Sequence, residues 1–180
     1  MQNIILTGNT LTLEDLVEVA RHGATVELSE EARQNVITSR AIVEDIVAKD
    51  KVVYGITTGF GEFSKVKISQ EDCAQLQENL IRSHACGYGP YFTTDIVRAI
   101  ILTRANALSK GYSGVRPQTL ETLIAMLNKG VHPLVPEKGS LGASGDLAPL
   151  SHMVLPMLGL GEAEYQGVHM SGKEAMDKAG

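Results

Sequence analysis

The chain has 180 residues, 43% of them hydrophobic, and a formal net charge of −5 at pH 7, which predicts one or two folded domains with a buried core. The negative charge and an aromatic content of 4% argue against nucleic-acid binding, which uses basic patches and stacking side chains. Two cysteines are too few for a disulfide framework, and neither a signal peptide nor a membrane span is visible, so we expect a soluble, cytoplasmic protein.

The first elements are two short strands separated by a helix. Residues 4–6 and Thr25–Leu28 have the alternating or apolar pattern of short strands. Between them, Thr12 and Asp15 form a capping box, which predicts a helix that ends near His22. The next residue is glycine, which is favoured just after a helix end.

A long helix is expected next, from Ser29 as its N-cap to about Lys49. Residues 52–54 then lead into a glycine-rich loop, 54–61. The helix should bury a single apolar face. The residues of that face are Ala32, Val36, Val43, Ile46 and Val47.

Three further helices follow in the middle of the chain. Ser69 and Asp72 predict the start of the first, which ends before Gly87 and carries a stripe of Cys73, Leu76, Leu80 and His84. The second runs from Thr94 or Asp95 to about residue 110. The third opens at Pro117, because proline is favoured in a first helical turn, and stops at residue 130.

The last third of the chain contains two helices and a hairpin. Asp146 is expected to cap a helix that kinks around Leu155, because Pro156 removes a backbone donor. Residues 162–170 read as a hairpin around Gly167. Ser171 then begins a helix that runs to the end of the chain. Helices with short strands make the predicted fold mainly α.

The most informative segment is 139–153, whose centre is Ala143-Ser144-Gly145. A glycine lets its amide nitrogen approach the Ala143 carbonyl carbon in a tight bend. Ring closure there would release one water, and loss of the Ser144 hydroxyl would release a second. The product would be an electron-poor ring with an exocyclic methylene, a group suited to reaction with amines.

The segment 139–150 resembles the signature of the aromatic amino acid ammonia-lyases and aminomutases. The resemblance implies that residues 143–145 form the prosthetic group 4-methylidene-imidazol-5-one (MIO), with no external cofactor. It extends over nearly the whole chain, while members of the family are more than twice as long. We therefore expect residues 1–180 to be the N-terminal part of the ammonia-lyase fold, without its C-terminal helical part.

Two other interpretations concern the same segment. Glycine-rich turns at helix starts bind phosphate, but here acidic Asp146 follows and no Gly-Lys-Ser/Thr motif is present.

For Asp146 itself, the residue type favours a helix cap. The resemblance adds a second role, in which its carboxylate assists ring formation. Both roles are compatible, and capping alone is the more conservative interpretation.

The loop at 54–61 is similar to the Tyr-Gly-x-x-Thr-Gly-Phe-Gly loop of the family. The resemblance implies that Tyr54 is the base that acts at the substrate β-carbon and that Gly61 lies against the substrate. The alternative is a half-buried tyrosine at the end of a strand, with its hydroxyl bonded to backbone. The density of glycines is compatible with a ligand close to the backbone.

His84 lies on the apolar stripe of its helix, where a lone histidine usually packs or bonds terminal carbonyls. Its surroundings resemble the Ser-His-Ala-x-Gly segment of histidine ammonia-lyases, which implies that His84 binds the substrate ring. An imidazole facing benzene would lose its hydrogen bond, so His84 argues against phenylalanine as substrate. The other histidines share no ligand spacing, and no metal site is expected.

The resemblance implies non-oxidative deamination of L-histidine to urocanate and ammonia by a homotetramer of a carbon–nitrogen lyase. The methylene derived from Ser144 would capture the amine, Tyr54 would remove the proton, and His84 would hold the ring. A tyrosine ammonia-lyase or tyrosine aminomutase is the alternative within the family. An inactive structural or oligomerising domain is the alternative of another class, and we expect residues 1–180 alone to be inactive.

Overall fold

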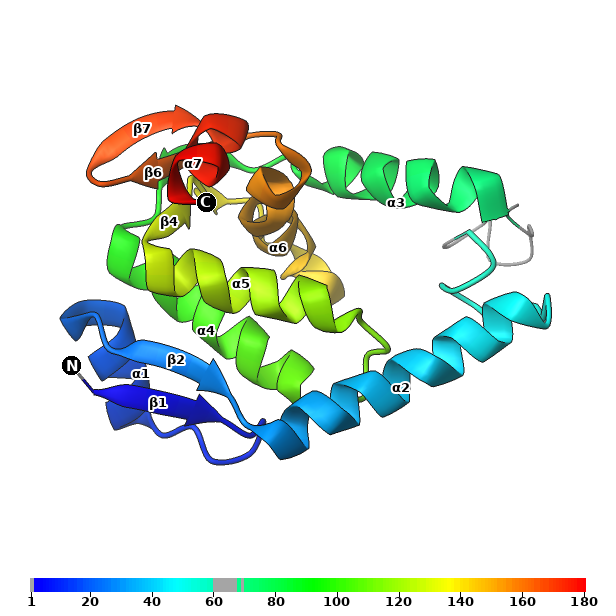
Figure 1. Cartoon of the computed structure of the whole chain (residues 1–180). Helices are drawn as coiled ribbons and strands as arrows, with labels where there is room; N and C mark the ends of the chain where they lie inside the picture. The colour runs from blue at the N-terminus through cyan, green and yellow to red at the C-terminus, as the bar shows by residue number, and fades with distance from the viewer. Residues whose placement is uncertain (1, 60–67, 69) are drawn as a thin grey trace.

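The structure, a computed structural model, describes residues 2–59, 68 and 70–180, without the side chains of 70–74 and 143. It is mainly helical with short strands, as the sequence predicts (Figure 1). Two expected features lie outside the described parts: Gly61, and the helix cap formed by Ser69 and the side chain of Asp72. Within the described residues, no helix has the length and apolar character that crossing a membrane requires.

The N-terminal elements have the predicted bounds. Strands β1 (Asn3–Leu6) and β2 (Thr25–Leu28) pair in parallel, and α1 (Leu13–His22) connects them. The capping box is present in both directions: the Thr12 side chain accepts from the Asp15 N–H, and the Asp15 carboxylate accepts from the Thr12 N–H. Gly23 has a φ of 73°, a left-handed conformation that ends the helix with little strain.

Helix α2 (Glu30–Ala48) begins as predicted, with the Ser29 hydroxyl accepting from the Ala32 N–H at 3.1 Å. Only Ala32 and Val36 are buried. The remaining residues of the expected apolar face are only half-buried: Val43, Ile46 and Val47. The reason is geometric, because the second half of α2 extends beyond the body of the molecule (Figure 1). The five-residue face is therefore correct only over the first two turns.

The core is centred on α4 (Thr94–Ser109), which packs against α1 and α5 (Pro117–Lys129). Both new helices have the predicted limits within one residue. Each fully buried aliphatic side chain contributes about 1.5–3 kcal/mol to stability. The half-buried Arg98 guanidinium links the two neighbouring helices, because it donates to the carbonyls of Val19 on α1 and Leu127 on α5. It also donates to His132 Nε2. The fully buried side chains here include Ile101, Leu102, Leu120 and Leu127.

The strands of the second half only partly match the prediction. The expected hairpin is present as β6 (Glu162–Tyr165) and β7 (Val168–Ser171), with Gly167 at a φ of 76°. Strand β4 (Val131–Pro133) extends that sheet, and β3 (Tyr88–Tyr91) pairs with β5 (Pro136–Lys138). Strands β3, β4 and β5 each contain a proline. Because proline is rare inside strands, the sequence pattern did not predict them.

Helices α3 (Gln70–His84) and α6 (Leu147–Val154) pack together, and residues 139–146 lead directly into α6. Helix α6 gives way at Leu155 to a 3₁₀ turn, η3 (Leu155–Leu158), as expected from Pro156. The chain ends in α7 (Gly172–Ala179), whose Ser171 hydroxyl accepts from the Glu174 N–H.

Candidate active site

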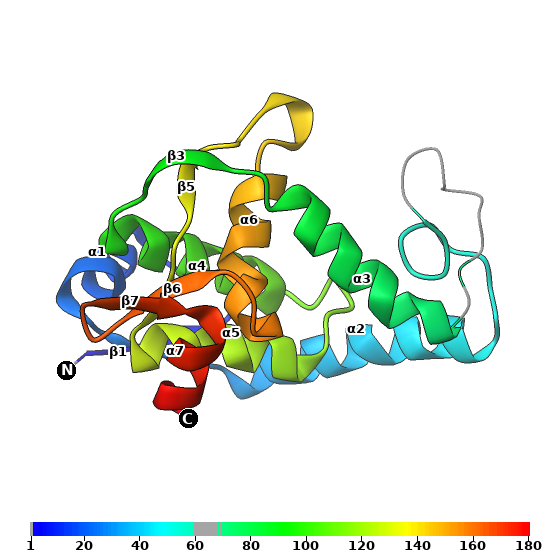
Figure 2. The ribbon, with the colours of Figure 1, turned by 90° about the horizontal axis from the view of Figure 1, so that it is seen from above.

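The segment expected to cyclise forms an exposed loop between β5 and α6. Residues Gly142–Ser144 make one 3₁₀ turn, η2, and Gly142 has a φ of 66°. Leu141 is 86% exposed and Ser144 is also exposed. Figure 2 shows this loop projecting from the body at the end of α6 that faces the C-terminal end of α3. The Ser144 hydroxyl is therefore open to a ligand from outside this chain.

Gly145 has ordinary backbone angles but a close neighbour in the Ser140 side chain. Its φ and ψ are −58° and −20°, ordinary helical values. A Cβ atom at this position would lie only 2.7 Å from the Ser140 hydroxyl oxygen. A side chain at residue 145 would therefore require Ser140 to move, and the sequence interpretation that glycine eases the approach of its amide to Ala143 stays a prediction.

Asp146 does not cap α6 with its side chain, which corrects the conservative interpretation. The residue occupies the N-cap position, but its φ of −83° and ψ of −6° are helical, and its side chain makes no capping hydrogen bond. A capping side chain normally needs an extended backbone at that residue. The preceding 3₁₀ turn fixes Asp146 in a helical conformation, and its carboxylate is exposed beside the loop.

His84 is half-buried at the last residue of α3, and its tautomer is fixed by its own helix. The Nδ1 atom lies 2.8 Å from the Leu80 carbonyl oxygen, which can only accept, so Nδ1 carries the proton. The Ser83 hydroxyl lies 3.1 Å from the same nitrogen. The Nε2 atom is then the hydrogen-bond acceptor in the His84 ring. It suits a ligand that presents an N–H or O–H group.

The end of α3 is joined to the loop through a tight contact of two glycines. A Cβ on Gly139 would lie 3.1 Å from the Gly87 α-carbon and 3.2 Å from the Ala148 Cβ. The Gly87 N–H donates to His152 Nε2 at 3.0 Å. Sequence reasoning missed His152, because a single histidine without ligand spacing gives no signal of such a contact.

Tyr54 lies in a turn rather than at the end of a strand, and its side chain is 62% exposed. Buried threonines hold this turn: the Thr57 hydroxyl donates to the Lys51 carbonyl at 2.6 Å and accepts from the Val53 N–H at 2.9 Å. The Tyr54 side chain is thus more exposed than the half-buried alternative requires.

The structure brings two of the predicted site elements together and leaves the third apart. Gly139, at the start of the loop that carries Ser144, lies against Gly87, three residues beyond His84 at the C-terminal end of α3. The turn that contains Tyr54 lies near the N-terminal end of α3 in both ribbon views. A helix of 15 residues is about 22 Å long, so this turn and His84 lie near opposite ends of α3.

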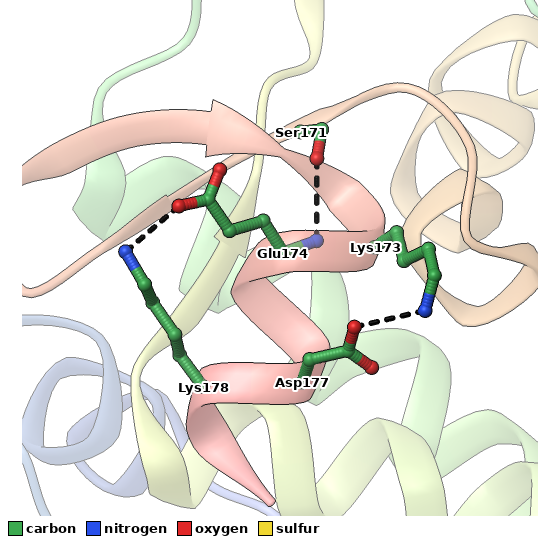
Figure 3. A pocket seen from close by; sticks show the side chains of 5 residues that line it. All are labelled: Ser171, Lys173, Glu174, Asp177 and Lys178. Carbon is green, nitrogen blue, oxygen red and sulfur yellow. Dashed lines mark hydrogen bonds and ion pairs between the residues drawn. The ribbon is translucent and has the colours of Figure 1, made fainter.

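A hollow elsewhere on the described surface is a weaker candidate for a reaction site. A hollow on α7 is lined by Ser171, Lys173, Glu174, Asp177 and Lys178 (Figure 3). Its charges are paired within the helix, Lys173 with Asp177 and Lys178 with Glu174, each at 2.8 Å. Among the residues that the structure describes, no group of three acidic, histidine or cysteine side chains could hold a metal ion.

Residues 11–180 match the aromatic amino acid lyase family. The histidine ammonia-lyase of Clostridium tetani (strain Massachusetts / E88) is 75% identical over 180 residues, which is 100% of this chain and 35% of that protein. The chain therefore spans about a third of the length of that curated relative.

Two solved structures are similar to the whole chain. Ergothionase of Treponema denticola, an ergothioneine-degrading enzyme, has a TM-score of 0.94 at 36% identity, over 99% of this chain and 36% of that one. Tyrosine aminomutase of Streptomyces globisporus has a TM-score of 0.89 at 38% identity, over 98% of this chain and 33% of that one. Similar folds thus act on different substrates, and the substrate must be argued from the site residues.

Proposed function

Because the chain belongs to the aromatic amino acid lyase family, we propose that it is part of a carbon–nitrogen lyase that converts L-histidine to urocanate and ammonia. One observation supports this most: the loop that carries the exposed Ser144 starts at Gly139, which lies against Gly87, just beyond the helix that presents His84. The identity of 75% to a curated histidine ammonia-lyase supports the same substrate.

The loop fits the MIO prosthetic group. Glycine at residue 145 leaves the turn undisturbed, since a Cβ there would lie 2.7 Å from the Ser140 hydroxyl oxygen. Ser144 is exposed at the tip of the turn, where the methylene would arise from its side chain. When formed, the group supplies an electrophile that takes up the substrate amine. Asp146, with its carboxylate beside the loop, remains available to assist ring formation.

His84 selects the substrate ring in this proposal. Its Nε2 atom accepts the imidazole N–H of histidine, while Nδ1 stays bonded to the Leu80 carbonyl. A phenylalanine ring offers no donor, so its binding would leave Nε2 without a partner, at a cost of about 1–3 kcal/mol. Tyr54 removes the proton from the carbon next to the ring, a role implied by the resemblance of its loop to that of the family.

The position of the Tyr54 turn, near the end of α3 opposite His84, supports an active site shared between copies of the protein. One copy would contribute the loop and His84, and another would contribute Tyr54, within a homotetramer. Apolar side chains around the loop are exposed in the single chain: Leu141, Leu147, Tyr88 and Tyr91. Neighbouring subunits that pack on these side chains would remove this apolar surface from water. The chain alone is accordingly expected to be inactive.

The alternative substrate is tyrosine, since His84 Nε2 also accepts from a phenol O–H group. Similarity to a tyrosine aminomutase structure favours this candidate. The test uses a hybrid protein, in which residues 1–180 are followed by the remaining C-terminal part of the C. tetani relative. We expect urocanate from histidine and no product from tyrosine. Coumarate or β-tyrosine from tyrosine would instead support the alternative, and no turnover of either would support an inactive structural domain.

A further inference from the structure

His152 lies where three segments of the site meet. Its ring projects from α6 toward the Gly87 N–H, which donates to Nε2 at 3.0 Å. A Cβ on Gly87 would lie 3.0 Å from that nitrogen and 3.1 Å from Pro136 of β5. The imidazole, the start of the loop and the segment after α3 are therefore in direct contact.

The Gly87 N–H has no partner of its own within α3. The last backbone hydrogen bonds at the end of this helix are donated by Ala85 and Cys86, to Ile81 and His84. The next amide, that of Gly87, is turned toward α6 and bonds a side chain there. An unpaired N–H at such a half-buried contact would be destabilising.

We propose that His152 is a positioning residue of the active site: its neutral ring, protonated on Nδ1, holds the end of α3 that carries His84 in register with the Ser144 loop. This inference rests on the proposed function for the roles of His84 and Ser144. The hydrogen bond itself does not depend on that function.

Two features make histidine suited to this position. Nε2 can accept only when it carries no proton, and burial lowers the pKa of His152, which favours the neutral ring at pH 7. The bond also acts over a short path, because Gly87 is three residues from His84 and its α-carbon faces Gly139 of the loop. A shift of this segment would move His84 relative to Ser144.

The hydrogen bond is tested in the 180-residue chain by NMR. We expect the ¹⁵N shifts of His152 to report the Nδ1–H tautomer at pH 7. We also expect the Gly87 amide to exchange with solvent about tenfold faster in H152F than in the native chain. H152Q keeps an acceptor at a similar reach and should restore slow exchange. A charged ring or an Nε2–H tautomer in the native chain would overturn the proposal, whether or not H152F folds.

The positioning role is tested in the hybrid protein. H152F should raise the KM for histidine about tenfold, with a smaller fall in kcat and unchanged mass of the 143–145 segment. H152Q should return the KM to near its native value. The matched control is H169F, at a histidine that is 58% exposed on β7, and it should change neither constant. An H152F protein with native KM would refute the role.

Failure of the two proposals can be told apart. If the native hybrid protein does not turn over histidine, the proposed function fails, while the tautomer and exchange measurements still decide whether His152 holds Gly87. If the hybrid is active and Gly87 exchanges equally in native chain and H152F, the positioning proposal fails alone.

Discussion

The Ser140 hydroxyl oxygen occupies the space beside Gly145 in which any side chain would begin: a Cβ there would lie 2.7 Å from it. G145A should therefore distort the turn and prevent ring closure in the hybrid protein. The measurement is the intact mass of the 143–145 segment, which should show no loss of water, together with the loss of histidine turnover.

The double variant G145A/S140A is the control for that steric cause. Removing the Ser140 oxygen frees the space, and the φ of −58° at residue 145 is open to alanine. We expect partial recovery of the dehydrated mass. If G145A cyclises as fully as the native protein, Ser140 does not enforce glycine at this position.

The substitution H84F tests the assignment of Nε2 as the acceptor for the substrate ring. Loss of that hydrogen bond should raise the KM for histidine by about tenfold or more, since an unpaired imidazole N–H in the complex costs about 1–3 kcal/mol. H22Q, at an exposed histidine in the last turn of α1, is the matched control and should leave the KM unchanged. An equal KM in H84F and native protein would rule out ring recognition by His84.

An active site shared between copies of the protein, as proposed, predicts complementation between two inactive hybrids. Y54F should lower kcat about 10²–10⁴-fold, the usual contribution of a general base, and S144A should lower it at least as much. When both variants are mixed as subunits of one oligomer, some sites combine a native Tyr54 with a native Ser144. Activity should then rise well above that of either variant. Mixed oligomers with no gain in activity would mean that each site is built within one chain.

The pH dependence of stability follows from two histidines. Burial lowers the pKa of both His132 and His152, and the nearby Arg98 charge lowers that of His132 further, against the opposing effect of Glu164. As the pH falls, the histidines of the unfolded chain are protonated before those of the folded chain, near their ordinary pKa of about 6.5. The stability that the neutral rings contribute is complete above that pH and is lost as the pH falls toward the lowered values.

Urea unfolding of the 180-residue chain at pH 7.5 and 5.5 measures this effect. The free energy of unfolding should fall on acidification, and by less in H132Q/H152Q, whose amides do not titrate. In the native chain Arg98 donates to His132 and the Gly87 N–H donates to His152. Glutamine at either position keeps a hydrogen-bond acceptor for that donor. An identical decrease in both proteins would show that neither histidine controls the acid sensitivity.

Local signals in the sequence predicted much of the fold. The Thr12–Asp15 capping box, Ser29, Pro117 and the glycines after helices act within one turn, so their effect depends on near neighbours only. The pairing of β3 with β5 was not predictable in this way. It joins Tyr88 to Lys138, 50 positions later, through segments with prolines.

The site was predictable only in part for the same reason. The motifs indicate Ser144, His84 and Tyr54 as candidate site residues. Local patterns do not predict how the segments that carry them pack against α3. The contact of His152 with Gly87 spans 65 positions and depends on the packing of α6 on α3. Asp146 has the right type for a cap, yet the 3₁₀ turn before it imposes a backbone that prevents capping.

The central claim is that residues 143–145 condense into an electrophilic ring. Mass spectrometry of the peptide that contains them, from the active hybrid protein, tests this most directly. The account predicts a peptide lighter by two waters, and an S144A peptide without that loss in a protein at least about a thousandfold slower. An unmodified Ser144 peptide from a hybrid that deaminates histidine at full rate would contradict it.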